Sequence, residues 1–152
     1  MSDALQTTSR RRWMSILACA QPAALAAAWA QLRPVPAHVL LRAPESGLVM
    51  VRGRVGGSGA RFNVGEMTVT RCVVQLDDGA VGHAWVQGRD GEHARTAALA
   101  DALLQSAHWH ELVYRSVIAP LSRQHEERRA ARAQAAAATR VDFYTLARGE
   151  DT

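Results

Sequence analysis

The chain has 152 residues, and 18 basic against 14 acidic residues give it a formal net charge of +4 and a pI near 10. This length supports one domain with one core, covering residues 1–152. Every basic residue is arginine, which excludes a P-loop nucleotide site because that motif needs a lysine after its last glycine. Arginine suits bidentate contacts with phosphate and carboxylate, although a genome-wide preference for arginine and alanine codons explains the same composition.

The first helix is predicted over Ala4–Ala20, where Trp13, Ile16, Leu17 and Ala20 fall at the spacing of one apolar helix face. The segment also imitates a secretory signal, with an arginine cluster followed by an apolar run, but Gln21 and Pro22 interrupt that run. We therefore expect it to belong to the mature fold. The sequence contains no run of eighteen strongly apolar residues, so no membrane-spanning helix is predicted. Cys19 and Cys72 lie far apart without metal-ligand spacing, so a reducing compartment, the cytoplasm, is expected.

A second helix is predicted over Pro22–Gln31, because proline is tolerated in the first helical turn. The proline-containing segment 33–47 that follows is expected to be an extended connector. Two strands are then predicted, over 47–55 and 62–76, with a glycine-rich loop between them. In that loop the motif GRVG matches the GXXG of KH domains, but here it ends a strand, and glycines that need positive φ explain it better.

A hairpin is predicted at Asp78 and Gly79, a dipeptide that favours a two-residue type I′ turn. That turn pairs Leu76 with Val81, so Cys72 and His83 are expected on one face, as a small apolar thiol and a half-buried imidazole in the core. The stretch 67–74 is expected to form an exposed sheet edge that invites pairing with another chain.

The next helix is predicted from Asp90, an N-cap residue, with Glu92 at the positive end of the helix dipole. Leu99, Leu103, Leu104 and Ala107 make its expected apolar face. Pro120 is expected to kink or restart a helix that continues into an alanine-rich, charged tail. A last strand is predicted over 139–150, which completes an α+β fold: a mostly antiparallel sheet of about four strands with N-terminal and central or C-terminal helices.

Catalytic and metal-binding patterns are scarce in this sequence. No G-x-S-x-G or HExxH motif occurs, and His108 and His110 lack a third ligand, so no catalytic residue and no metal site are predicted. Glu66 and Arg71 point to opposite faces of one strand. Each therefore needs a partner elsewhere, unless both lie at an exposed edge, because a buried unpaired charge is costly.

Several blocks resemble one family in order along nearly the whole chain, notably GEMTVTRC, VGHAWVQGRD and RVDFYTLARGE. They are similar to the PhnG subunit of the bacterial carbon-phosphorus lyase system, which degrades phosphonates. The resemblance implies an obligate hetero-oligomer with PhnH, PhnI and PhnJ subunits. It also implies that ATP is the substrate of the complex, that PhnI is the nucleosidase, and that S-adenosylmethionine and an iron-sulfur cluster belong to PhnJ, with no cofactor bound by this chain alone.

Three hypotheses remain open on this sequence. The chain is an accessory, noncatalytic subunit, or it contributes residues that contact the anionic ligand or a partner, or it is an arginine-rich nucleic-acid-binding module. Against the third, glutamates interrupt the basic run RQHEERRAAR and stacking aromatics are lacking there. The candidate ligand or interface residues are Arg52, Arg54, Arg61, Glu66, Arg71 and His83.

Overall fold

The computed structural model describes residues 3–32 and 34–139, which form an α+β fold with an antiparallel sheet, as predicted. In the described residues no helix is both long enough and apolar enough to cross a membrane. The elements in chain order are α1 (Asp3–Cys19), α2 (Pro22–Trp29), β1 (His38–Arg54), the 3₁₀ turn η1 (Val55–Gly57), β2 (Arg61–Leu76), β3 (Val81–Gln87), α3 (Gly91–Gln105), α4 (Ala107–Val113), the π-helical segment η2 (Tyr114–Ile118) and α5 (Ala119–Ala138).

The sheet has the order β1-β2-β3 and contains three strands within the described part of the chain, against about four predicted. The additional predicted strand falls on residues 139–150, which lie almost entirely outside the described residues. The prediction that residues 67–74 form a sheet edge is wrong, because β2 is the central strand and pairs with β3 over Val69–Gln75. Within the described residues, the edge strands are β1 and β3, and β2 is also unpaired on one side where it runs beyond β3.

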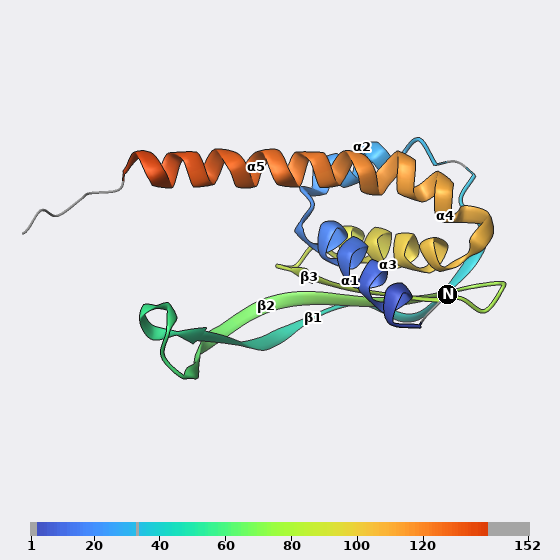
Figure 1. Ribbon diagram of the computed structural model, residues 1–152. Helices are drawn as coiled ribbons and strands as arrows, with labels where there is room; N and C mark the ends of the chain where they lie inside the picture. The colour runs from blue at the N-terminus through green and yellow to red at the C-terminus, as the bar shows by residue number, and fades with distance from the viewer. Residues whose placement is uncertain (1–2, 33, 140–152) are drawn as a thin grey trace, which may run out of the picture.

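Strand β1 begins at His38, so the second half of the predicted connector belongs to the sheet. Its register with β2 shifts between Leu40 and Arg42 and again between Arg42 and Glu45. Pro44 lies within the second irregularity, where an edge strand tolerates the missing N–H group. Together β1 and β2 form a long two-stranded ribbon that continues past α1 and α3, while α5 extends in the same direction (Figure 1).

The predicted type I′ turn is wrong. Gly79 has a φ of 87°, but no residue other than glycine has positive φ in the described chain, so Asp78 does not adopt the conformation that this turn requires. Leu76 donates its N–H to the Ala80 carbonyl oxygen, which makes Asp77, Asp78 and Gly79 a three-residue loop. The register consequently shifts by one residue, and Val73 rather than Val74 pairs with His83.

This one-residue shift separates the two residues that were expected to share the core face. Cys72 is buried opposite Ala84, whereas His83 is exposed on the other face of β3 together with Trp85. A shift of one residue exchanges the faces of a strand because side chains alternate. The expectation of a half-buried His83 imidazole is therefore wrong, and the expectation for the Cys72 thiol is confirmed.

The helices cover one face of the sheet (Figure 1). Helix α3 packs on β2 and β3, and its Asp90 N-cap is confirmed by the bond from the His93 N–H to Asp90 Oδ1, at 2.9 Å. The predicted faces of α1 and α3 are buried, except that Ala107 is exposed and begins α4. The π-helical turn η2 precedes Pro120, which then lies in the first turn of α5, where its missing N–H group costs little.

Gly82 lets α3 approach β3 closely. A Cβ atom at this position would lie 2.8 Å from Ala102 Cβ and closer still to the Ala98 carbonyl oxygen. The facing positions of α3 are the small residues Ala94, Ala98 and Ala102, all buried. Glycine within a strand commonly marks such an approach of another backbone.

Replacement of Gly82 by alanine should destabilise the fold by about 1 to 3 kcal/mol or more, because the helix must move away from the sheet. Gly65→Ala is the matched control, since no atom lies within 4 Å of its Cβ position. Urea unfolding followed by circular dichroism measures both. Equal stability of the two variants would contradict the close packing described above.

Candidate functional site

A charged cluster lies on the sheet face that the described helices leave uncovered. Glu45 Oε2 accepts hydrogen bonds from Arg42 Nη1 at 2.9 Å and from Arg71 Nη2 at 3.1 Å, with Arg71 Nε at 3.3 Å. The Arg71 guanidinium also lies 5.6 Å from the ring centre of Trp85, which is 50% exposed. The hydrogen bonds from Arg42 and Arg71 lower the pKa of Glu45. Arg71 of β2 is thus paired with Glu45 of the neighbouring strand β1.

Glu66 lies on the opposite face of β2 from Arg71, as predicted, and pairs in register with Met50. It is exposed on the part of the ribbon that projects beyond the helices. Arg54 and Arg61 face one another at the ribbon end, and Arg52 lies two pairs further in, opposite Asn63. All three arginines are exposed.

The structure therefore divides the predicted candidates between two regions. Arg52, Arg54, Arg61 and Glu66 lie along the projecting ribbon, whereas Arg71 and His83 lie on the uncovered sheet face. The distance along β2 from Arg61 to Arg71 is ten residues, or about 33 Å at strand rise, so one small ligand does not contact both regions. A direct ligand contact by any of them stays a prediction.

The other sequence motifs form no reaction centre. Gly56 in the glycine-rich loop has a φ of 59°, which accounts for glycine at that position. His108 stacks edge-on against Trp109, while His110 points elsewhere and bonds to a backbone carbonyl. Across residues 3–32 and 34–139 no group of three histidine, cysteine or carboxylate side chains is placed to hold a metal ion.

Asp101 is a fully buried carboxylate that the sequence analysis did not single out. Its Oδ1 accepts from Trp13 Nε1 at 2.8 Å, and its Oδ2 accepts from Arg10 Nη2 at 2.7 Å and from the His83 N–H at 3.0 Å. The Gln105 amide adds a longer bond of 3.4 Å. These donors come from α1, β3 and α3 itself. With both oxygens occupied and no exposure to solvent, Asp101 has a structural role.

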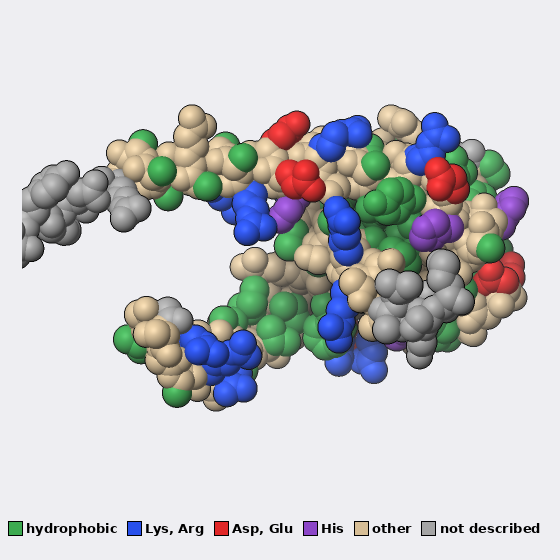
Figure 2. All heavy atoms as spheres, viewed as in Figure 1, with side chains coloured by type: hydrophobic (Ala, Val, Ile, Leu, Met, Phe, Trp, Pro, Cys, Tyr) green, Lys and Arg blue, Asp and Glu red, His purple; other side chains and the backbone are tan. Residues whose placement is uncertain are grey.

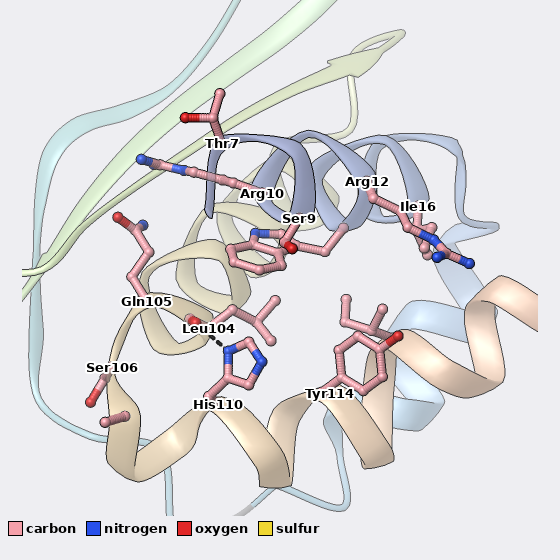
Figure 3. Close-up of a pocket in the computed structure, with 13 residues that line it drawn as sticks. Thr7, Ser9, Arg10, Arg12, Ile16, Leu104, Gln105, Ser106, His110 and Tyr114 are labelled. Atoms are coloured by element: carbon pink, nitrogen blue, oxygen red, sulfur yellow. Dashed lines mark hydrogen bonds between the residues drawn. The ribbon is translucent and has the colours of Figure 1, made fainter. Parts of the chain in front are cut away.

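A cleft of about 870 Å³ lies between α1 and the α4–η2 segment (Figure 3). His110 Nδ1 donates to the Leu104 carbonyl oxygen, which fixes the ring tautomer, and the ring stacks on Tyr114 at 6.1 Å. The Trp13 and His110 rings pack in an edge-to-face arrangement, with their centres 5.7 Å apart. The described residues that line this cleft include Arg10 and Arg12 but no carboxylate and no cysteine, so His110 has no carboxylate or thiol partner there for acid–base or nucleophilic chemistry. The HWH motif was the sequence signal for this position.

The family model for "Phosphonate metabolism protein PhnG" matches residues 8–149, almost the whole chain. The chain belongs to the PhnG family. A curated relative from Rhizobium meliloti (strain 1021) is 46% identical over 153 residues, covering 99% of this chain and 96% of the relative. That relative is named alpha-D-ribose 1-methylphosphonate 5-triphosphate synthase subunit PhnG. The family resemblance inferred from the sequence blocks is confirmed.

Replacement of Asp101 by alanine should lower the free energy of unfolding by about 2 to 4 kcal/mol, because Trp13 Nε1 and the His83 N–H lose their buried acceptor. Asp77→Ala, which removes an exposed carboxylate from the β2–β3 loop, should change stability by less than about 0.5 kcal/mol. Urea titration of both variants measures the difference. A decrease in the free energy of unfolding below about 0.5 kcal/mol for the Asp101 variant would contradict the structural role assigned to Asp101.

Replacement of Arg71 by alanine should raise the pKa of Glu45 toward its ordinary value, with Arg42 still holding part of the shift. A lowered carboxylate pKa stabilises the fold above the unfolded-state value, and the contribution is lost as pH falls through the folded-state pKa. The pair is exposed, so its effect on stability is small. Carboxyl NMR titration measures the Glu45 pKa directly. Arg61→Ala, at the far end of β2, is the control and should leave it unchanged.

Proposed function

We propose that the chain is an accessory, noncatalytic subunit of alpha-D-ribose 1-methylphosphonate 5-triphosphate synthase, within the carbon-phosphorus lyase complex of phosphonate catabolism. The observation that carries this proposal is the 46% identity to the PhnG subunit of that synthase across nearly the full length of both chains. The complex releases adenine from ATP and joins methylphosphonate to C1 of the ribose, which keeps its 5-triphosphate. The bond from C1 to the adenine nitrogen breaks, and a bond from C1 to a phosphonate oxygen forms.

This chain supports that reaction without performing it. Adenine release needs a group that stabilises the leaving base and another that positions the phosphonate. Within the described residues, the cleft residue His110 has no carboxylate or thiol beside it, His83 is exposed on the sheet, and Asp101 is enclosed by its own donors. The chemistry is therefore assigned to other subunits. PhnI is the proposed nucleosidase, and PhnJ carries S-adenosylmethionine and the iron-sulfur cluster for the later bond cleavage.

The surface of the chain supports an obligate hetero-oligomer with PhnH, PhnI and PhnJ subunits. The ribbon exposes several large apolar side chains, including Leu48 at 64% and Met50 at 51%, with Phe62 and Val64 nearer its end. Helix α5 buries only Leu121 along its twenty residues, and its alanine-rich end is exposed. An isolated helix of this kind gains little from its own burial, so packing against a partner stabilises it. The cytoplasm, where ATP is available and two unpaired cysteines are stable, is the proposed compartment.

The nucleic-acid alternative gains no support from the family relationship, whose described role is phosphonate metabolism. Arg71, one of the arginines next to an exposed aromatic ring, is already bound to Glu45. Stacking of bases on Trp85 would therefore compete with an existing contact.

Coexpression with the PhnH, PhnI and PhnJ subunits of the same organism should yield one complex in size-exclusion chromatography that releases adenine from ATP in the presence of methylphosphonate. The chain expressed alone should self-associate as its concentration rises, because its apolar ribbon lacks a partner, and should release no adenine. The complex lacking this chain is the control. A stable monomer that binds none of the three subunits, or adenine release by the isolated chain, would overturn the proposal.

A further inference from the structure

Helix α5 presents a cationic stripe where a packed helix would normally be apolar. His125, Arg128, Arg129 and Arg132 follow the i, i+3, i+4, i+7 spacing of one helix face. All four line one cleft of about 720 Å³, together with the end of α1 and the β3–α3 connection. The opposite face of α5 carries Arg123 and Glu127. The stripe therefore lies on the face of α5 that is directed toward the rest of the molecule.

The arginines of this stripe form no ion pair within the described residues. Arg128 Nη2 donates to the Cys19 carbonyl oxygen at 3.1 Å and caps the end of α1. The ion pairs of the described chain involve Arg10, Arg42, Arg71 and Arg115, so none includes an arginine of the stripe. Asp90, a carboxylate that accepts the His93 N–H as an N-cap, lines the same cleft but forms no ion pair with these arginines. Arg129 and Arg132 remain exposed and available to an anionic group.

A second positively charged arm lies across from the stripe. Alternation along β1 places Leu48, Met50, Arg52 and Arg54 on the face that carries Ser46, whose hydroxyl bonds to Thr70 on the helix side of the sheet. Arg61, opposite Arg54, joins them, and Glu66, opposite Met50, is the acidic residue of this face. Figure 2 shows an open notch between the projecting part of α5 and the ribbon, with basic side chains on both arms.

We propose that this notch, bounded by the His125–Arg132 stripe of α5 and the Leu48–Arg54 face of β1, is the docking site for an acidic segment of another subunit of the synthase complex. The inference rests on the proposed function, since it names where and by what chemistry a partner binds. Charge complementarity identifies the occupant: guanidinium groups on both arms select carboxylates. The exposed apolar side chains of Leu48 and Met50, which lie between the stripe and the ribbon arginines, would be covered by side chains of that partner segment.

The dimensions favour a protein segment over a small anion. From His125 to the end of α5 at Ala138 are fourteen residues, which span about 21 Å at helical rise. A helix or strand of a partner fits along that length and buries the exposed alanines and the ribbon at once. A phosphate group would occupy only the base of the notch and leave the arms uncovered.

The test is a double variant, Arg129→Glu with Arg132→Glu, measured for binding to the coexpressed PhnH, PhnI and PhnJ subunits by biolayer interferometry. Arg128 is left intact because it caps α1. The matched control is Arg123→Glu, which makes the same kind of change on the opposite face of α5. The double variant should raise the dissociation constant roughly tenfold or more and flatten its dependence on salt between 50 and 300 mM. The control should bind as the wild type does.

The outcomes separate this inference from the function on which it rests. If the wild-type chain binds none of the subunits, the proposed function fails. If it binds and the double variant binds equally well with the same salt dependence, only the docking site is overturned. Competition by micromolar inorganic tripolyphosphate, abolished in the double variant, would also overturn it, because the stripe would then be a phosphate site. Circular dichroism and thermal unfolding confirm that each variant is folded.

Discussion

The carboxylate of Asp101 joins the layers of this fold at one point. It belongs to α3, accepts hydrogen bonds from Trp13 and Arg10 of α1, and receives the backbone N–H of His83 in β3. A buried carboxylate is tolerated only when its lone pairs are occupied, so the three elements must hold their relative positions. The alanines of α3 and Gly82 of β3 make this arrangement possible, because larger side chains would hold the helix too far from the strand.

The same arrangement leaves much of the chain without a place in the core. Three strands and the helices on one face enclose a small interior, while the ribbon and α5 project past it (Figure 1). The exposed large apolar residues concentrate on β1 and β2, among them Leu48, Met50 and Phe62. A monomer that exposes two arms, one apolar at its middle and both positively charged, is shaped for contact with other chains.

Helix positions and caps followed from the sequence because their signals are local. The apolar spacing of Trp13, Ile16 and Leu17 predicted α1, and Asp90 predicted the start of α3. The family blocks likewise identified the relationship that the comparisons established. The register of the β2–β3 hairpin could not be predicted from the sequence, because the Asp78-Gly79 dipeptide is compatible with more than one type of turn. The three-residue loop places Gly82, Ala84 and Val86 of β3 on the face that α3 covers, beside Cys72 and Val74 of β2. A type I′ turn would have put His83 and Trp85 there instead, so the close packing of α3 selects the observed loop.

Sequence by itself determined the fold class, the main helices with the Asp90 cap, and the family, because periodicity, capping residues and short blocks similar to the family are all read over short stretches of chain. Tertiary structure alone decided the partners of the charged residues. Arg71 meets Glu45 from a distance of 26 residues along the chain, and Asp101 meets Arg10 from 91. Such contacts depend on strand register and helix placement together. The stripe of α5 was visible as a spacing, but only the structure placed it across an open notch from the arginines of the ribbon.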